Sequence, residues 1–324
     1  MATLMEHLPR VKYAEYMQLD GTKKNQVERV GDSSIIRRFD KTAVPKNQID
    51  VVCPHFLELK WAYGCPFDCA WCFLKGTLRM LDTKTKPVVK EYCKIQKHVQ
   101  SFFENDGSSC ELLNAGELAD SLMTENDKEP FSKFIIPMFE QQDRHKVLLL
   151  TKSPCTKNLE KIKSHKQTIV SFSLNAPVVS KKWEMAPPIK KRIQAAKNLY
   201  QCGYNVRIRI DPIVPIEKWQ DHYFDLIKMI FDNFTPERIT FGSLRGLQST
   251  INNASDKSWV TFLTEKSNWG KKIAFDLRHQ LYSSIIKHLK EEYNFTKVAL
   301  CKETISMWEK LDMDYTKIQC NCLL

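Results

Sequence analysis

The stretch Gly64-Cys65-Pro66-Phe67-Asp68-Cys69-Ala70-Trp71-Cys72-Phe73 places three cysteines in one short loop with the spacing C-x3-C-x2-C. Soft thiolates gathered this closely suit an iron–sulfur cluster or zinc. A structural zinc site takes four ligands, and this loop contains no fourth Cys or His. Three thiolates on a four-iron cluster would leave one iron open to a substrate or cofactor. The turn-forming Gly64, Pro66 and Asp68 favour such a site over three cysteines that merely fill a core.

Strand-like and helix-like stretches alternate along the chain around this loop. The strand candidates are residues 56–63, 110–114, 146–150, 168–174, 205–210 and 238–243. The helix candidates are residues 87–104, 130–142, 157–163, 188–201 and 219–232. Alternation of this kind implies parallel strands joined by right-handed crossovers. We therefore predict an α/β fold, a partial and open (β/α)6 TIM-like barrel, over residues 51–250.

Two extensions flank the predicted barrel. Residues 1–50 show no strong periodicity and are interrupted by Gly21 and Gly31, so we expect an N-terminal extension with short helices. Residues 251–324 are expected to form a C-terminal extension of helices and strands that could cover the site.

Polar residues lie where the predicted strands end. The cysteine loop follows the first strand. The ends of the next five strands carry Gly116 and Glu117, Lys152 and Ser153, Ser173 and Asn175, Asp211, and Ser243 with Arg245. Because barrel enzymes build their sites at the carboxyl ends of the strands, these residues are predicted to meet at one site.

The cysteine spacing, followed by an aromatic residue, resembles the radical S-adenosylmethionine (SAM) enzymes. Between residues 50 and 245, further segments resemble spore photoproduct lyase and its relatives, in the expected order. They are Cys53-Pro54-His55-Phe56, Gly116-Glu117-Leu118-Ala119-Asp120-Ser121, Thr151-Lys152-Ser153, Ser171-Phe172-Ser173-Leu174-Asn175, Asp211-Pro212-Ile213 and Ser243-Leu244-Arg245.

This resemblance implies a radical enzyme of the SAM-dependent kind. It implies a [4Fe–4S] cluster held by Cys65, Cys69 and Cys72, with SAM chelated at the open iron. An electron from the cluster would split SAM and yield a 5′-deoxyadenosyl radical that takes hydrogen from a substrate carbon. An external electron donor such as flavodoxin or ferredoxin is implied as a partner.

The same resemblance gives several residues a role beside SAM. Phe73 is similar to an aromatic next to the adenine, although a plain hydrophobic plug would look the same. Gly116-Glu117 resembles the motif that receives the SAM amino group, and a carboxylate suits an ammonium. Lys152 could pair with the SAM carboxylate. Ser173 and Asn175 could bond the ribose hydroxyls or satisfy backbone groups at a strand end.

Residues at the ends of the last two predicted strands are the candidates for substrate contact. They are Asp211, Ser243 and Arg245. Asp211 precedes a proline, which fits a rigid turn at the barrel rim. Arg245 could hold a substrate phosphate with both sides of its guanidinium, or simply form an ion pair.

The chain departs from the lyases where they are expected to return hydrogen to the product. The lyases are expected to have a cysteine donor after the second strand, where this chain reads Gly116. Cys110 lies at the far end of that strand. The tail thiols Cys320 and Cys322 are further donor candidates, and they could instead form a redox pair, ligate a second cluster with Cys301, or belong to a frayed terminus.

A second departure lies in the cysteine loop, where Trp71 and Phe73 replace the tyrosines expected in the lyases. Neither side chain has an O–H to relay hydrogen. We therefore predict a radical isomerase that modifies a thymine-derived base in DNA, as in viral DNA hypermodification. A lyase of the spore photoproduct type, acting in DNA repair, is the alternative.

Charge and composition limit the partners and the compartment. The net charge is +11, which favours nucleic acid as a partner, although a lysine-rich solvated surface would give the same count. No apolar run is long enough to span a bilayer, and the first ten residues lack the apolar core of a secretory signal. Eleven cysteines favour a reducing compartment. We expect a cytoplasmic protein without a membrane partner.

Basic residues gather in two clusters that could contact phosphates. The clusters are Lys75, Arg79, Lys84, Lys86, Lys90, Lys94 and Lys97, and Lys181, Lys182, Lys190, Lys191, Arg192 and Lys197. Two rival functions remain open at this point. One is a zinc-stapled nucleic-acid-binding module without catalysis, and the other is a radical SAM enzyme with a small-molecule or peptide substrate.

Overall fold

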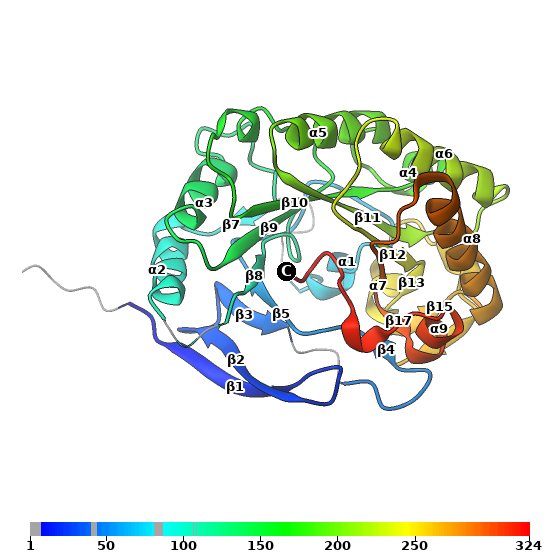
Figure 1. Ribbon diagram of the computed structural model, residues 1–324, viewed down its shortest axis with the longest axis horizontal. Coiled ribbons are helices and arrows are strands. Elements are labelled where there is room, and N and C mark those ends of the chain that lie inside the picture. Colours follow the sequence, from blue (N-terminus) through cyan, green and yellow to red (C-terminus); the bar gives the residue numbers. More distant parts are fainter. Residues whose placement is uncertain (1–7, 40–43, 81–86, 106, 108) are drawn as a thin grey trace, which may run out of the picture.

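Seven parallel strands form the centre of the fold and curve around an inner space (Figure 1). Across the sheet they are β5 (Phe56–Leu59), β8 (Leu112–Asn114), β9 (Lys146–Thr151), β10 (Thr168–Leu174), β11 (Asn205–Ile213), β12 (Ile239–Ser243) and β16 (Val298–Leu300). The computed structural model describes residues 8–39, 44–80, 87–105, 107 and 109–324. The predicted α/β fold and its six strands are confirmed, and β16 is a seventh parallel strand that the sequence did not reveal.

The first predicted strand is shorter than expected. The chain leaves the sheet after Leu59, where the Lys60 N–H bonds the Ile35 carbonyl at 2.7 Å. Residues 62 and 63 then form a separate strand, β6 (Ala62–Tyr63), which pairs with β7 (Val88–Val89). This break turns the chain toward the cysteine loop.

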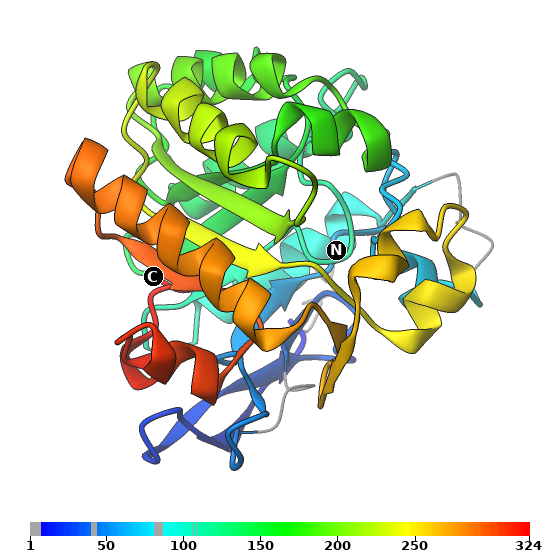
Figure 2. The ribbon, with the colours of Figure 1, turned by 90° about the vertical axis from the view of Figure 1, so that its right-hand side faces the viewer.

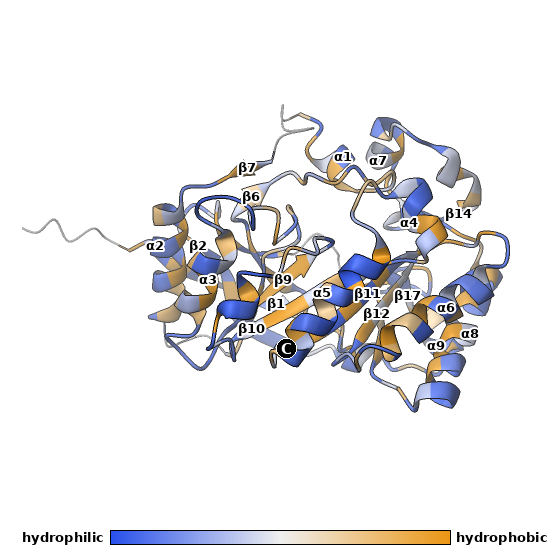
Figure 3. Ribbon diagram, turned by 90° about the horizontal axis from the view of Figure 1, so that it is seen from above, coloured by the Kyte–Doolittle hydropathy of each residue, from blue (hydrophilic) through white to orange (hydrophobic). Residues whose placement is uncertain are grey.

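The longer helices lie on the outer side of the parallel strands (Figure 1). They are α2 (Tyr92–Phe103), α3 (Phe131–Phe139), α5 (Ile189–Gln201), α6 (Trp219–Phe231) and α8 (Phe275–Tyr293). Polar residues face outward on α5 and α6 (Figure 3), whereas Ile189, Ile193 and Leu199 of α5 are buried. These helices stabilise the barrel by removing apolar surface from water. The stretch predicted as a helix at 157–163 contains only a 3-10 turn, η1 (Leu159–Lys161).

The N-terminal segment forms strands, so the prediction of short helices there was wrong. β1 (Val11–Met17), β2 (Lys23–Val30) and β3 (Ile36–Phe39) continue the main sheet as antiparallel neighbours of β5. Gly21 and Gly31 adopt positive φ in the two turns between them, a conformation that suits glycine. β1 is exposed or half-buried along its whole length, which hides the alternation that marks a strand in sequence.

The segment after β12 closes one side of the molecule. β13 (Arg245–Gly246), β14 (Glu265–Ser267) and β15 (Gly270–Lys272) form a small antiparallel sheet next to α7 (Gln248–Asn253) and η2 (Ser258–Phe262). α7 lies against α1 (Leu74–Thr77), as Figure 2 shows. This approach requires Gly76, because a Cβ atom there would lie 2.7 Å from the Thr250 nitrogen.

The C-terminal tail enters the space that the strands enclose. α8 leads into β16, and β17 (Glu303–Thr304) then pairs with β4 (Val51–Val52). After α9 (Ile305–Lys310) and η3 (Tyr315–Lys317), residues 318–324 run to the centre of the ring of strands (Figure 1). None of the helices in the described parts of the chain is long and apolar enough to cross a membrane.

Candidate active site

A cavity of about 330 Å³ lies at the carboxyl ends of the parallel strands. Residues from the ends of β8, β9, β10, β11, β12 and β16 line it, together with the cysteine loop and the tail. The predicted site residues among the lining are Cys69, Cys72, Phe73, Gly116, Glu117 and Lys152, and also Ser173, Asp211, Arg245, Cys320 and Cys322. The fold therefore brings most of the predicted residues to one place.

The cysteine loop folds back on itself at one wall of this cavity. Gly64, at φ 88°, starts the turn, and the Cys72 N–H bonds the Cys69 carbonyl at 3.1 Å. The loop is tied to α4 (Pro177–Trp183), because the Ala70 N–H bonds the Trp183 carbonyl at 2.8 Å. Cys65 is not part of the cavity lining, but its thiol is close enough to Cys69 and Cys72 to interact with both electrostatically.

The three thiols lie in surroundings that disfavour thiolates without a cation. Burial raises the pKa of the Cys69 thiol to about 12 and raises those of Cys65 and Cys72 as well. Soft metal ions bind thiolates strongly and would reverse this effect. The loop therefore fits a metal centre better than a set of free thiolates.

A single zinc ion does not fit this part of the chain. Among the described residues, no three His, Cys, Asp or Glu side chains converge closely enough to hold one metal ion. Ligands of one zinc ion would lie within about 4 Å of each other. The cysteines of a four-iron cluster bind different irons and are spaced more widely. An iron–sulfur cluster at the loop is therefore compatible with this arrangement.

Gly116 and Glu117 follow β8 at the cavity wall. A Cβ atom on residue 116 would lie 2.4 Å from the Leu150 Cβ, so glycine is needed for the close approach of the two strand ends. Glu117 turns toward the cavity, where its carboxylate interacts electrostatically with Arg209. No described residue forms a hydrogen bond or an ion pair with that carboxylate, which leaves it able to accept N–H groups from a ligand.

Lys152 is held in a buried network that the sequence did not predict. Its ammonium donates to Glu184 Oε1 at 2.7 Å and to Ser173 Oγ at 2.9 Å, and Arg192 donates to Glu184 Oε2 at 2.9 Å. Burial raises the pKa of Glu184, but Lys152 and Arg192 lower it more, so the net shift is downward. Lys152 therefore stands as a fixed cation beside Cys69.

Arg192 is a correction to the charge analysis, which placed it in a basic surface cluster. It is fully buried and engaged with Glu184, so it cannot contact a phosphate from outside. Its sequence position carried a usable signal, because it lies three residues after Ile189 and four before Ala196, on the buried side of α5. Lys84 and Lys86 of the other predicted cluster lie outside the described residues.

Asn175 and Ser243 do not reach the cavity, which corrects two of the expected contacts. Asn175 is fully buried, donates to the Pro212 carbonyl at 2.8 Å and accepts from Tyr223 Oη at 2.9 Å. Ser243 is also fully buried and donates to Glu303 Oε2 at 3.1 Å. Both side chains satisfy polar groups at strand ends, as such residues commonly do.

Asp211 and Arg245 form a bidentate ion pair at the cavity wall. Arg245 Nη1 and Nη2 donate to Asp211 Oδ1 and Oδ2 at 2.8 and 2.9 Å, and Arg209 Nε donates to Asp211 Oδ2 at 3.3 Å. Burial raises the pKa of Asp211, but the two arginines lower it more. Asp211 accepts from both Nη atoms of Arg245. Of the two expected roles of Arg245, the structure therefore shows the ion pair, and both Nη atoms are already engaged where a substrate phosphate would bind.

The tail brings two thiols into the cavity, whereas Cys110 stays away from it. Cys320 and Cys322 are buried cavity-lining residues. Cys110 is exposed at the amino end of β8 and is not among the residues that line the cavity. The direction of the strand explains this, since its two ends open on opposite sides of a barrel. Cys110 is therefore not placed to donate hydrogen at this site.

Comparisons with known proteins agree with this arrangement. The family model described as spore photoproduct lyase matches residues 21–245, more than half of the chain. The spore photoproduct lyase of Clostridium acetobutylicum is 23% identical over 192 residues, covering 57% of this chain and 54% of that protein. The Bacillus subtilis enzyme of the same name is 24% identical over 176 residues, 53% of this chain and 50% of that protein. The chain thus spans about half the length of these curated relatives.

Solved structures share the fold. Spore photoproduct lyase complexed with dinucleoside spore photoproduct matches with a TM-score of 0.61 and 15% identity over 75% of each chain. A double mutant of spore photoproduct lyase with bound AdoMet and dinucleoside spore photoproduct matches with a TM-score of 0.61 and 17% identity over 76% of each chain. The chain belongs to the spore photoproduct lyase family.

Proposed function

We propose that this member of the spore photoproduct lyase family is a radical SAM enzyme that removes a hydrogen atom from a thymine-derived base in DNA. The proposal is carried by one observation, the meeting of the cysteine loop with Glu117 and Lys152 at a single cavity. That set offers thiolates for a [4Fe–4S] cluster, an acceptor for an ammonium group and a donor for a carboxylate.

When bound, the cluster and SAM would supply a 5′-deoxyadenosyl radical at this cavity. Cys65, Cys69 and Cys72 would hold the cluster, and Glu117 would accept the amino group of SAM. An ammonium has three N–H donors, and Lys152 uses two of them on Ser173 and Glu184. The third remains to bind the carboxylate of SAM.

Support for a DNA base as substrate comes from the relatives and from charge. Structures of spore photoproduct lyase with the same fold were solved with dinucleoside spore photoproduct. The net charge of +11 suits a polyanion, and Lys181 and Lys182 are exposed on α4, the helix to which the cysteine loop is bonded.

Gly116 supports rearrangement or modification of the base over simple cleavage. The resemblance predicts a hydrogen-donating cysteine there in the lyases, and any Cβ on residue 116 would overlap Leu150. A rearrangement returns the hydrogen that was first removed and needs no protein thiol. We therefore propose an isomerase that modifies a thymine-derived base, as in DNA hypermodification.

A lyase acting on spore photoproduct is the second candidate. Cys320 and Cys322 line the same cavity, so an S–H group could reach a product radical there. The curated relatives carry the lyase name, which also favours this candidate.

The formation of 5′-deoxyadenosine tests the radical SAM assignment. Anaerobically reconstituted protein, with dithionite in place of the physiological electron donor, is expected to form 5′-deoxyadenosine from SAM. The Cys65/Cys69/Cys72→Ala variant should form none, whereas a Cys93/Cys202→Ala control, which changes two exposed thiols, should match the wild type. Equal yields from the wild type and the triple variant would refute the assignment.

Two product analyses separate modification from repair. Incubation with dinucleoside spore photoproduct should leave it unchanged if the enzyme is an isomerase, and should release thymidines if it is a lyase. Mass spectrometry of nucleosides from DNA made with and without the gene should reveal a modified thymidine only in the isomerase case.

A further inference from the structure

Four cysteines outside the cysteine loop line the same cavity. They are Cys53, Cys301, Cys320 and Cys322. Cys53 lies between β4 and β5, Cys301 follows β16, and the other two belong to the tail. None of the four is in a disulfide. Segments far apart in the sequence thus bring four free thiols to one place.

The four sulfurs are close enough to affect one another. The side chains of Cys320 and Cys322 share a hydrogen bond. Cys53 interacts electrostatically with Cys301 and Cys322, and Cys320 interacts with Cys53 and Cys301. We refer to these four residues as the cysteine tetrad.

Three cations lie beside the cysteine tetrad, together with the carboxylates of Asp211 and Glu117. Arg209 Nη2 lies 2.8 Å from Cys301 Sγ, and Arg209 Nη1 lies 4.0 Å from Cys322 Sγ. Arg245 Nη2 lies 3.6 Å from Cys301 Sγ, and Lys302 interacts with Cys53. Arg209 and Arg245 also bind Asp211, so these guanidinium groups lie between that carboxylate and the sulfurs, where they would offset the charge of thiolate ligands.

Asn321 fixes the two tail sulfurs in place. Its Nδ2 donates to Ser171 Oγ at 2.8 Å and to the Ile208 carbonyl at 2.9 Å. Its backbone N–H donates to Thr240 Oγ1 at 2.9 Å, and that hydroxyl donates back to Asn321 Oδ1 at 2.8 Å. Because Asn321 stands between Cys320 and Cys322, these bonds hold both thiols against the inner face of the strands. Such support is typical of a preorganised binding site.

We propose that the cysteine tetrad binds a second iron–sulfur cluster, distinct from the one at Cys65, Cys69 and Cys72. Four cysteines are the usual ligand set of [2Fe–2S] and [4Fe–4S] clusters. Four thiolates give such a cluster a net negative charge, which Arg209, Arg245 and Lys302 would offset. No three described ligand side chains converge on one ion, and an iron–sulfur cluster does not require this, since its cysteines are shared among several irons.

The two cysteine sets have different electrostatic surroundings. Cys65 and Cys69 interact with Asp120, Lys152 and Glu184, whereas the tetrad interacts with Arg209 and Lys302. The two sets share none of these partners, so a variant of one set can be tested for its effect on the other. Ligation would also leave no S–H on the tail for hydrogen donation, in agreement with a rearrangement.

Buried cysteines that serve only as small apolar residues are the simplest rival explanation. Apolar filling explains neither the 2.8 Å contact between Arg209 and Cys301 nor the hydrogen-bonded support of the tail at Asn321. A thiol that donates hydrogen would account for one member of the tetrad and leave the others without a role. Cluster binding accounts for the four sulfurs and the cations together.

Iron and sulfide content of the anaerobically reconstituted chain tests this proposal. The intact protein should bind about six or about eight irons, one four-iron cluster plus a [2Fe–2S] or a second [4Fe–4S] cluster. The Cys65/Cys69/Cys72→Ala variant should keep the second cluster, with about two or four irons and the matching Mössbauer signal, although it forms no 5′-deoxyadenosine. An intact chain with four irons or fewer would overturn the proposal, as would a triple variant that binds only zinc.

A complementary variant removes the tetrad and spares the first cluster. Cys320/Cys322→Ser should lose only the second set of irons, whereas a Cys93/Cys202→Ser control should lose none. Reductive cleavage of SAM, measured on the same samples, reports on the first cluster. Failure of the tetrad proposal would thus leave that cleavage intact, and failure of the radical SAM proposal would abolish it in every sample. Unchanged iron content in Cys320/Cys322→Ser would also overturn the tetrad proposal.

Discussion

Gly116 occupies the point where β8 ends at the cavity, and its lack of a side chain has two consequences. The strand end can approach Leu150 closely, since a Cβ atom would lie only 2.4 Å from the Leu150 Cβ. The same crowding denies this position to a cysteine. One residue therefore shapes the cavity wall next to Glu117 and excludes a hydrogen donor at that wall.

Gly116→Ala is expected to destabilise the protein by about 1–3 kcal/mol, because the added methyl group overpacks a site without free space. It should also weaken SAM binding, since the shift must displace Glu117. Urea unfolding and equilibrium binding of SAM measure the two effects. Lys290→Ala, at an exposed residue of α8, is the control. SAM affinity equal to that of the wild type would contradict the role given to Gly116.

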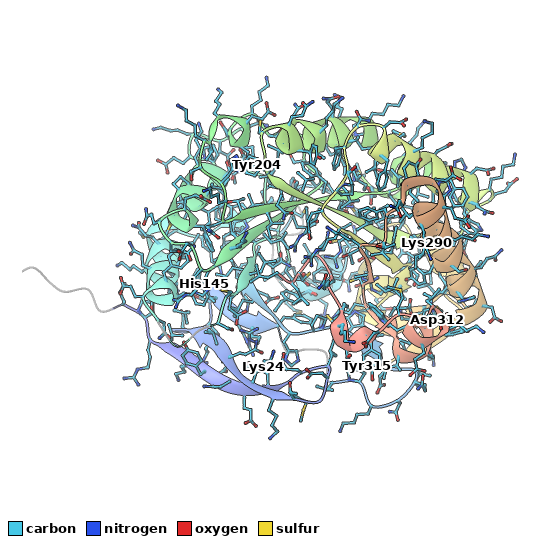
Figure 4. All side chains as sticks on the ribbon, viewed as in Figure 1. Lys24, His145, Tyr204, Lys290, Asp312 and Tyr315 are labelled. Carbon is cyan, nitrogen blue, oxygen red and sulfur yellow. The ribbon has the colours of Figure 1, made fainter. Side chains whose placement is uncertain are left out.

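His145, labelled in Figure 4, is a buried residue that should make stability depend on pH. Burial, with Arg144 nearby, lowers the pKa of His145 to about 4. Arg144 Nε lies 2.9 Å from its Nε2, and the Glu111 nitrogen lies 3.3 Å from its Nδ1. Neutral imidazole can accept a hydrogen bond at one of these nitrogens and imidazolium at neither, so the folded state favours neutral imidazole.

The folded-state pKa is below the unfolded value of about 6.5, so stability from His145 is present above pH 6.5 and is lost as the pH falls toward 4. The expected loss is about 2 kcal/mol by about pH 5. His145→Gln should remove this part of the pH dependence in denaturant titrations, whereas His222→Gln, at a partly exposed residue, should keep it. The same pH dependence in wild type and His145→Gln would refute the account.

At the scale of elements, apolar periodicity predicted the helices and strands that carry their own pattern. It missed the strands that can be recognised only from their pairing with distant segments. The strand at residues 168–174 and the helix at 188–201 were confirmed within a residue, because each carries its own apolar pattern. β16 has only three residues, too few to show a period. β1 was missed because its residues are exposed or half-buried and show no apolar alternation. Only its pairing with β2 identifies it as a strand.

The site was predictable to a similar extent. Glu117 and Lys152 were predicted to lie at the site because strand ends and the family resemblance both indicated them, and both line the cavity. Their contacts with SAM stay a prediction. Glu184 follows α4 and has no distinguishing neighbours in sequence, so only the packing of α5 against β10 reveals its pairing with Lys152. The meeting of Cys53 with the tail thiols likewise depends on the path of the tail through the barrel.

The attachment of the C-terminal tail inside the barrel should depend on Asn321. Asn321→Ala removes the bonds to Ser171, Ile208 and Thr240, which should cost about 1–3 kcal/mol in tail attachment. Hydrogen exchange should then become faster in residues 318–324 and remain unchanged in β10. Asn253→Ala, at an exposed helix end, is the control. Unchanged exchange in the tail would show that Asn321 does not anchor it.

At the scale of the whole molecule, positive charge and the position of the cavity should together orient the proposed DNA substrate. α4 carries the exposed Lys181 and Lys182 next to Trp183, whose carbonyl is bonded to the cysteine loop. Lysines on α8, such as Lys290 (Figure 4), lie on the outer side of the barrel. Phosphates that approach the cavity should therefore meet α4 before α8.

Lys181/Lys182→Gln is expected to weaken binding to a DNA oligonucleotide and to reduce the slope of log affinity against log salt by roughly 1–2, as for two lost phosphate contacts. Lys287/Lys290→Gln removes the same charge from α8 and should have a smaller effect. Fluorescence anisotropy over a salt series measures both slopes. Equal losses in the two variants would indicate general charge attraction in place of a defined DNA path.

The central claim is that three thiolates leave one iron open, and that SAM binds this iron beside Glu117. Hyperfine spectroscopy of the reduced protein with SAM labelled with 15N at its amino group tests it most directly. We predict a 15N coupling to the reduced cluster in the wild type and in Cys320/Cys322→Ser, and its loss in Cys65/Cys69/Cys72→Ala. A reduced wild-type cluster that shows no 15N coupling would contradict the account.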